Sequence, residues 1–235
     1  MKGPFVLEIM EMIIDDVQDD RTTLHACCLV SKAWISRSRR YLFQEVVLDS
    51  FVTFSKISAI LHSVSKPGEW VRTLTVEEEN NYPWVVRALQ AMVHYLPSIV
   101  ELRLFGVFAD WVDVAHSIGT FSTLRAVSLD YLGWVQERGV CTARVPLQLE
   151  RMSMRACEKR EVMEWITSAK EQPQLREVVV LDLCEPELDA FNHLLRRLGD
   201  NLEALTFGAD TDEERMQAPP HVFLSSSDWF PSSST

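Results

Sequence analysis

Seven short segments of the chain repeat one hydrophobic pattern, Leu-x-x-Leu-x-Leu with apolar substitutes. They are FQEVVL from Phe43, VRTLTV from Val71, IVELRL from Ile99, LRAVSL from Leu124, LERMSM from Leu149, LREVVV from Leu175 and LEALTF from Leu202. Successive segments begin 25 to 28 residues apart. Because side chains alternate along a β-strand, the spacing predicts one strand per segment, buried on one side. Self-similarity at such a period indicates repeated structural units.

Helical patterns separate several of these segments, with apolar residues at helical spacing in 84–96, 162–169 and 188–198. Strands that alternate with helices predict an α/β fold, a strand–helix solenoid with a parallel sheet and helices on one side. The period and pattern resemble those of leucine-rich repeats. Such repeats place a ladder residue three positions beyond the last apolar one, and only Cys157 matches it. Leu132, Leu183 and Asp210 hold the equivalent positions elsewhere, so the repeats are degenerate.

The N-terminal helical pattern is apolar on two sides. One stripe consists of Leu7, Met10, Ile14 and Val17, and a second of Ile9, Met12 and Ile13. A second helix, for which Thr22 or Thr23 is the expected cap, is almost encircled by Leu24, Cys27, Cys28, Leu29 and Val30. Helices this apolar have more to bury than a small module can cover, so the rest of the chain or a partner must cover them.

Four aspartates and two adjacent cysteines in this region raise the question of metal binding. Asp15, Asp16, Asp19 and Asp20 lack the alternating ligands, glycine turn and distal glutamate of a calcium loop, so we expect a solvated helix exit. Cys27 and Cys28 lack the paired ligand spacing of a zinc site and the Cys-x-x-Cys spacing of a redox pair. We therefore expect the two thiols to pack as small hydrophobic groups.

The segments EMIIDDV, DDRTTLHACCLVSKAW and SRRYLFQEVVL together resemble an F-box, closely those of the large F-box families of mushroom-forming fungi. The resemblance covers about residues 5–48 and keeps the spacing from Ile13 through Leu29 and Trp34 to Phe43. The Leu-Pro that opens the family's pattern falls on Phe5 and Val6, with a proline displaced to Pro4.

The resemblance implies a helical module that docks on the Skp adaptor of a cullin–RING ubiquitin ligase. It places the adaptor contacts at Phe5, Val6, Glu8, Ile9, Ile13, Leu29, Val30, Ser31 and Lys32. It also implies that Trp34 and SRRYLF fold the module onto the chain that follows.

The register of the repeats predicts which residues stand on the open face of the sheet, away from the helices. They are Thr73, Thr75, Glu77, Glu101, Arg103, Phe105, Ala126, Ser128, Asp130, Arg151, Ser153, Arg155, Glu177, Val179 and Leu181. We expect the target to contact Glu101, Arg103, Phe105, Arg151, Arg155, Val179 and Leu181. The alternative for Val179 and Leu181 is that the next repeat or the C-terminal segment covers them.

Composition narrows the class of protein. The 235 residues carry a net charge of −11, which argues against nonspecific electrostatic binding of nucleic acid over a large surface. No apolar run approaches the length of a membrane span, and Glu8 and Glu11 interrupt what would be a signal peptide. Five cysteines without framework spacing fit reduced thiols in the cytoplasm or nucleus. We find no catalytic, metal-binding or cofactor motif and expect no enzymatic activity.

The sequence thus predicts an F-box-like module at 1–45, a repeat region at 46–209, and an acidic, Ser- and Pro-rich tail at 210–235 that is expected to be flexible. The first functional hypothesis is a substrate-recognition subunit of a Skp–cullin–F-box ubiquitin ligase. The alternative, favoured by the departure at Phe5 and Val6, is a repeat-based interaction protein that does not engage the ligase.

Overall fold

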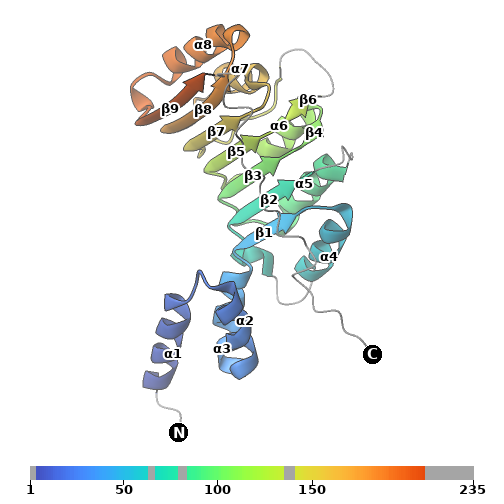
Figure 1. Ribbon diagram of the computed structural model, residues 1–235, viewed down its shortest axis with the longest axis vertical. Helices are drawn as coiled ribbons and strands as arrows, with labels where there is room; N and C mark the ends of the chain where they lie inside the picture. Colours follow the sequence, from blue (N-terminus) through green and yellow to red (C-terminus); the bar gives the residue numbers. More distant parts are fainter. Residues whose placement is uncertain (1–3, 63–66, 79–83, 135–140, 210–235) are drawn as a thin grey trace.

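The computed structural model describes residues 4–62, 67–78, 84–134 and 141–209. Each of these four ranges contributes at least one strand to a single parallel sheet (Figure 1). Its seven strands are β1 (Glu45–Leu48), β2 (Thr73–Glu77), β3 (Glu101–Phe105), β5 (Ala126–Asp130), β7 (Arg151–Arg155), β8 (Glu177–Leu183) and β9 (Ala204–Ala209). They pair in this order, so each strand lies beside the next one along the chain. All seven predicted strands are confirmed.

The strands pair in register with the repeated sequence pattern. Leu74 of β2 pairs with Leu102 of β3, which in turn pairs with Val127 of β5. The same row continues through Met152 of β7 to Val178 of β8. These residues are all buried, because the row faces the helices. The first apolar residue within each of these strands therefore packs beside the equivalent residue of the next strand.

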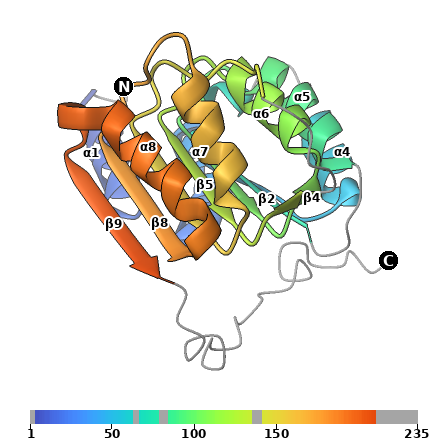
Figure 2. The same ribbon diagram turned by 90° about the horizontal axis from the view of Figure 1, so that it is seen from above.

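Helices cover one face of the sheet, and the opposite face carries none of them (Figure 2). The covering helices are α4 (Phe51–Leu61), α5 (Trp84–Tyr95), α6 (Trp111–Thr120), α7 (Lys159–Ser168) and α8 (Leu188–Leu198). Three of them, α5, α7 and α8, confirm the three predicted helical patterns. Short 3-10 turns occupy η1 (Pro67–Trp70), η2 (Glu185–Glu187) and η3 (Gly199–Asn201). The fold is α/β, with its main core between the helices and the sheet.

One interval of the helix layer holds an extended segment instead of a helix. Cys141, Ala143 and Val145 are buried there, between α6 and α7. The indole Nε1 of Trp165 in α7 donates a hydrogen bond of 2.9 Å to the carbonyl oxygen of Ala143. On the other side, a Cβ at Gly119 of α6 would collide with the carbonyl oxygen of Arg144. Glycine thus lets the segment approach α6 closely enough to fill the layer.

A left-handed residue follows the end of several strands. Gly106, Tyr131 and Ala156 have positive φ angles directly after β3, β5 and β7, and Asp182 has one near the end of β8. The next residue in each case is apolar and buried, namely Val107, Leu132, Cys157 and Leu183. These are the positions at which leucine-rich repeats place a ladder residue, with Asp210 lying outside the described residues. A two-strand sheet of β4 (Phe108–Ala109) and β6 (Gly133–Trp134) follows two of these turns.

A buried ion pair ties the turn after β7 to the turn after β8. Lys159 Nζ donates to the carbonyl oxygens of Cys157 and Asp182 at 3.0 and 2.9 Å and lies 3.5 Å from Glu187 Oε2. The Glu187 carboxylate also accepts from the backbone N–H groups of Lys159 and Cys184. Burial raises the pKa of Glu187, but these hydrogen bonds outweigh it and hold the pKa below its ordinary value. These hydrogen bonds offset part of the free-energy cost of burying the two charged groups.

The N-terminal helices form a separate head beyond β1, at the opposite end of the sheet from β9 (Figure 1). They are α1 (Pro4–Asp16), α2 (Arg21–Val30) and α3 (Lys32–Leu42). Among their described side chains, the buried apolar residues are Ile14, Leu24 and Cys27, and none of the three belongs to the main core. The α2 cap differs from the expectation: Asp20, not Thr22 or Thr23, accepts the hydrogen bond from the Thr23 N–H at 3.0 Å.

We predict that Gly106→Ala destabilises the sheet by more than about 1 kcal/mol, because the left-handed conformation alone costs an L-residue about 1–2 kcal/mol. The new Cβ would also collide with the carbonyl oxygen of Glu78. Chemical denaturation measures the loss. Gly208→Ala is the control, since its Cβ would make only ordinary contact with Leu181. Equal stability of the two variants would contradict the assignment of a strained turn at Gly106.

Candidate functional site

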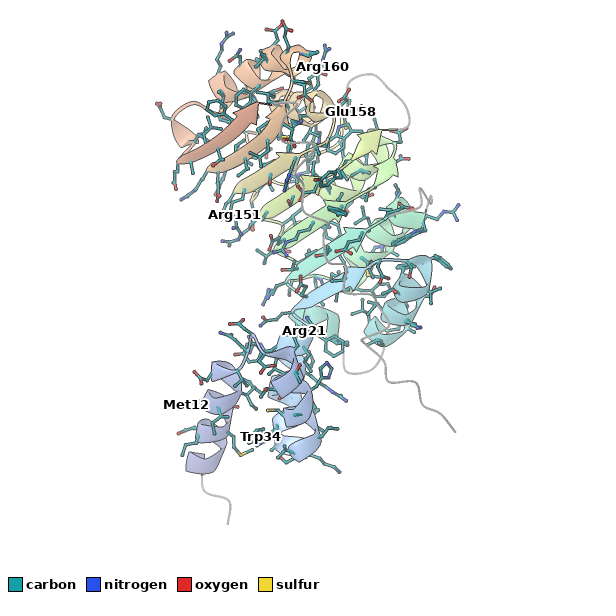
Figure 3. The ribbon with its side chains drawn as sticks, in the orientation of Figure 1. Met12, Arg21, Trp34, Arg151, Glu158 and Arg160 are labelled. Carbon is teal, nitrogen blue, oxygen red and sulfur yellow. The ribbon has the colours of Figure 1, made fainter. Side chains whose placement is uncertain are left out.

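The head exposes large apolar side chains that its own core does not cover. Thirteen large hydrophobic residues are exposed in the described part of the chain, and five of them lie on α1 and α2: Ile9, Met12, Ile13, Leu29 and Val30. Leu29 is 88% exposed and Met12 is 70% exposed; Figure 3 places Met12 on α1. Single exposed apolar residues are common on surfaces, so the concentration on two short helices distinguishes this part of the head as a candidate interaction surface.

Six of the nine predicted adaptor residues are exposed, and four of these six belong to the apolar set just described. Glu8, Ile9, Ile13, Leu29, Val30 and Lys32 are exposed, and Ser31 is half-buried between α2 and α3. Phe5 and Val6 lie in the first turn of α1, and their side chains fall outside the described part. The second apolar stripe predicted for α1 is thus exposed, while Ile14 of the first stripe is buried. Met12, which the resemblance does not assign to the adaptor, is exposed beside Ile13 on the same helix.

A polar clasp holds α1 against α3. The Asp15 carboxylate accepts hydrogen bonds from Arg37 Nε at 2.7 Å and from Arg37 Nη2 at 2.5 Å. Tyr41 Oη donates to the same carboxylate at 2.7 Å. The Arg37 hydrogen bonds lower the pKa of Asp15 to about 2, with Tyr41 contributing. Asp15 is therefore a structural residue, which corrects the expectation that all four aspartates form a solvated exit.

The segment from Cys27 to Trp34 packs only partly within the head. The predicted burial of the thiols is confirmed for Cys27. Cys27 is buried, whereas Cys28 and Trp34 are half-buried. Burial raises the pKa of the Cys28 thiol, so this thiol stays protonated at neutral pH. Figure 3 shows Trp34 within the head, on α3. The expected folding of the module by Trp34 thus involves partial rather than complete burial of the indole.

A chain of charged side chains connects the head to the open face of the sheet. Arg21 of α2 lies 4.0 Å from Glu45 of β1, at the place where head and sheet meet (Figure 3). Glu45 lies 3.6 Å from Arg103 of β3, whose Nε donates to Glu101 at 3.0 Å. The hydrogen bonds to Glu101 raise the pKa of Arg103. Glu101 and Arg103, both predicted to contact a target, are engaged with each other.

The predicted open-face residues differ in exposure. Arg103, Arg151 and Arg155 are exposed, and most of the others are half-buried. Thr75 and Ala126 are buried, which corrects their assignment to the solvated face. A neighbouring strand covers small residues more easily than long ones, which accounts for both. Val179 and Leu181 are half-buried, and the Leu181 side chain lies close to Gly208 of β9, so the adjacent strand covers part of it.

An aromatic and cationic cluster lies at the C-terminal rim of the open face. Phe105 and Tyr131 stack edge to face with ring centroids 5.3 Å apart. The Arg155 guanidinium carbon lies 5.9 Å from the Tyr131 ring centroid. Tyr131 is exposed and has a positive φ, at a repeat position where the preceding unit uses Gly106. The left-handed conformation costs a tyrosine about 1–2 kcal/mol, and Ala156 and Asp182 adopt it at the equivalent turns of the following units.

Asp130 borders this rim cluster, since it pairs in register with Phe105 and Arg155. Burial raises the pKa of the Asp130 carboxyl group, which accepts a hydrogen bond from Ser128 Oγ at 3.0 Å. The rim therefore presents one cation, one partly buried carboxyl group and two aromatic rings. Arginine and tyrosine are the residue types enriched at the centres of protein interfaces.

Arg151 differs from the arginines along the N-terminal edge of the sheet. Arg125 pairs with Glu150 at 3.4 Å, and Arg176 pairs with Glu203 at 3.2 Å. Arg151 lies at the start of β7 (Figure 3) and has no ion-pair partner among the described residues. It pairs in register with Glu177 but makes no ion pair with it. Its guanidinium group is therefore available to a partner.

The described part of the chain holds neither a metal-ligand cluster nor a thiol with a lowered pKa. No group of three or more His, Cys, Asp and Glu residues there could hold a metal ion. All five cysteines are free, and burial raises the pKa of Cys141, of Cys184 and, to about 12, of Cys157. These thiols stay protonated at neutral pH and are poor nucleophiles. Over the same residues, we find no helix whose length and hydrophobicity would let it cross a membrane.

Fold and surfaces together define an α/β protein with one all-parallel, repeat-like sheet and a helical head. A scan against protein-family models finds no matching family, and a search of curated proteins finds no match.

We predict that Asp15→Asn weakens the head at neutral pH and that the difference from wild type disappears as the pH falls from about 4 to 2. The folded pKa of Asp15 is below its unfolded value, so its stabilisation is present above the unfolded pKa and lost as the pH approaches 2. Fluorotryptophan NMR of Trp34 during urea unfolding reports on the head alone. Asp16→Asn is the control, because Asp16 is exposed; a pH-independent effect of Asp15→Asn would contradict the clasp.

Proposed function

We propose that the chain is the substrate-recognition subunit of a Skp–cullin–F-box ubiquitin ligase. In this proposal the head docks on the Skp adaptor, and the open face of the sheet binds the target protein. The chain performs no chemistry itself: it raises the effective concentration of the target near a ubiquitin-charged partner. The observation that carries the proposal is the exposed apolar surface of α1 and α2, at the positions that the F-box resemblance assigns to the adaptor.

The energetics of the head support a docked state. Among the described side chains of the head, three apolar residues are buried and contribute about 1.5–3 kcal/mol each, which is little to offset the ordering of three helices. The exposed Ile9, Ile13 and Leu29 would add comparable amounts if a partner covered them. A head of this kind gains much of its stability from its partner, as a docking module does.

The sheet supports the second half of the proposal through its uncovered face. Helices occupy one side of the sheet only (Figure 2), and the register aligns side chains of neighbouring strands into rows on the other side. Leucine-rich-repeat-like units that stack in this way present an extended surface to partners. The rim cluster of Phe105, Tyr131 and Arg155, together with Arg151, is the part of this face best suited to anchor a target.

We predict that Ile9→Asp combined with Leu29→Asp weakens adaptor binding at least 100-fold. Each aspartate would bring a charge into an interface that must lose water, which costs several kcal/mol. Titration of purified Skp adaptor against the full chain, by calorimetry or co-purification, measures the effect. Leu188→Asp is the matched control, because Leu188 is an exposed leucine on α8, away from the head. Equal adaptor binding by wild type and double variant would overturn the docking role and leave the repeat-based interaction protein as the alternative.

We predict that the triple substitution of Phe105, Tyr131 and Arg155 by alanine removes target binding and leaves adaptor binding unchanged. Interface residues of these types commonly contribute about 2 kcal/mol or more each, so proximity labelling should lose the proteins held by this face. Arg160→Ala is the control, since Arg160 pairs with Glu164 on the exposed side of α7. The three residues do not belong to the main core, so circular dichroism should match the wild type. An unchanged set of labelled proteins would place the target elsewhere.

A further inference from the structure

A hollow of about 500 Å³ lies at the junction between the head and the sheet. Its wall combines Arg40 at the end of α3, Gln44 just before β1, Glu69 and Trp70 of η1, Arg72 just before β2, and Ser98 just before β3. Small-molecule sites commonly have volumes of about 300–1,000 Å³ and occur where two structural units meet. Neither the adaptor surface nor the open face of the sheet uses these residues.

The hollow is rich in hydrogen-bond donors. Arg72 Nη1 donates to the carbonyl oxygen of Ser98 at 3.0 Å, which holds this guanidinium group in place while its other N–H groups remain available. Arg40 is exposed and makes no hydrogen bond or ion pair within the described ranges. The Gln44 amide adds further donors. Glu69 is the one carboxylate among the described residues of the wall, so two cations face one anion in a protein whose net charge is −11.

Arg40 and Arg72 do not serve as hydrogen-bond donors to the carbonyl oxygens at the end of α3. The last carbonyl oxygens of α3 already have donors: Phe43 N–H bonds to Arg39 O at 2.9 Å and Gln44 N–H to Tyr41 O at 3.1 Å. The carbonyl oxygen of Leu42 accepts from Arg21 Nη2 at 3.3 Å. The helix dipole attracts Arg40 to the C-terminal end of α3, but the carbonyl oxygens there do not use its guanidinium N–H groups as donors.

We propose that this hollow binds a phosphate-bearing small molecule, with Arg40 and Arg72 as its anion ligands. Two guanidinium groups match phosphate oxygens through forked, charge-assisted hydrogen bonds, and arginine is the residue best suited to this geometry. Trp70 is half-buried and lines the same hollow as the two arginines. A free polyphosphate would use the arginines alone, whereas a nucleoside phosphate would also stack its ring on Trp70.

Binding there couples the two units of the molecule. Arg40 belongs to the head, whereas Trp70 and Arg72 belong to the sheet region. A phosphate held by both arginines bridges the two units and restricts the head relative to the open face. The inference concerns the junction itself and stands whether or not the head docks on a Skp adaptor.

The test is calorimetric titration of the full chain with tripolyphosphate and, separately, with ATP, at low salt and at about 150 mM salt. We expect saturable binding of one molecule per chain, weakened at least tenfold by Arg40→Ala and by Arg72→Ala, and partly restored by Arg40→Lys. Arg160→Ala, which removes a paired arginine on α7, should bind as the wild type does. Equal affinity for both probes assigns a free polyphosphate; tighter binding of ATP that Trp70→Leu abolishes assigns a nucleoside phosphate.

Two results would overturn the proposal. One is the absence of saturable binding of either probe at millimolar concentration. The other is wild-type affinity in both alanine variants, which would place the anion elsewhere. Circular dichroism of each variant, and Arg40→Lys as a substitution that keeps the charge, separate loss of the site from loss of the fold. Adaptor binding, measured on the same samples, is independent of both outcomes.

Discussion

In-register pairing of seven parallel strands is the constraint on which the rest of the structure depends. Because each strand lies beside the next one in sequence, the chain must return to the same end of the sheet after every strand. It does so over one face, so helices or an extended segment fill that side and leave the other uncovered. The register also decides which side chains are buried: a slip of one residue would turn Leu102 and Leu104 outward and bring Arg103 into the core.

The same constraint separates the two candidate surfaces by their physical origin. The open face is a by-product of the sheet, so a rigid backbone holds its side chains in rows. The head depends instead on a small apolar cluster and on the Asp15–Arg37–Tyr41 clasp. A partner that covers Ile9, Ile13 and Leu29 would therefore complete the head, whereas a partner on the open face would meet a preformed surface. Charged side chains from Arg21 to Arg103 connect the two.

The strands were predictable from the sequence because alternating apolar residues that recur every 25 to 28 positions are typical of stacked strands and of few other structures. The residues exposed on α1 and α2 followed from stripes too extensive for a small core. Other features depend on contacts between distant residues: Arg37 contacts Asp15 across 22 positions, and Arg72 donates to the carbonyl oxygen of Ser98 across 26 positions. The sequence did not single out Tyr131, because it lies one residue beyond the alternating pattern. Its backbone is left-handed, a conformation that glycine indicates in a sequence and tyrosine does not. The Asp20 cap, by contrast, could have been found, since aspartate is as good a cap as threonine.

The head and the sheet each bury their own apolar cluster, and this division bears on how the protein responds to heat. Ile14, Leu24 and Cys27 share no cluster with the large core between helices and sheet. Cooperativity in unfolding requires that the loss of one part deprive the other of contacts, and here that coupling passes mainly through charged groups and the junction. We therefore expect more than one unfolding transition, with the head opening at a lower temperature than the sheet. One melting temperature for the whole chain would describe the sheet and say nothing about the head.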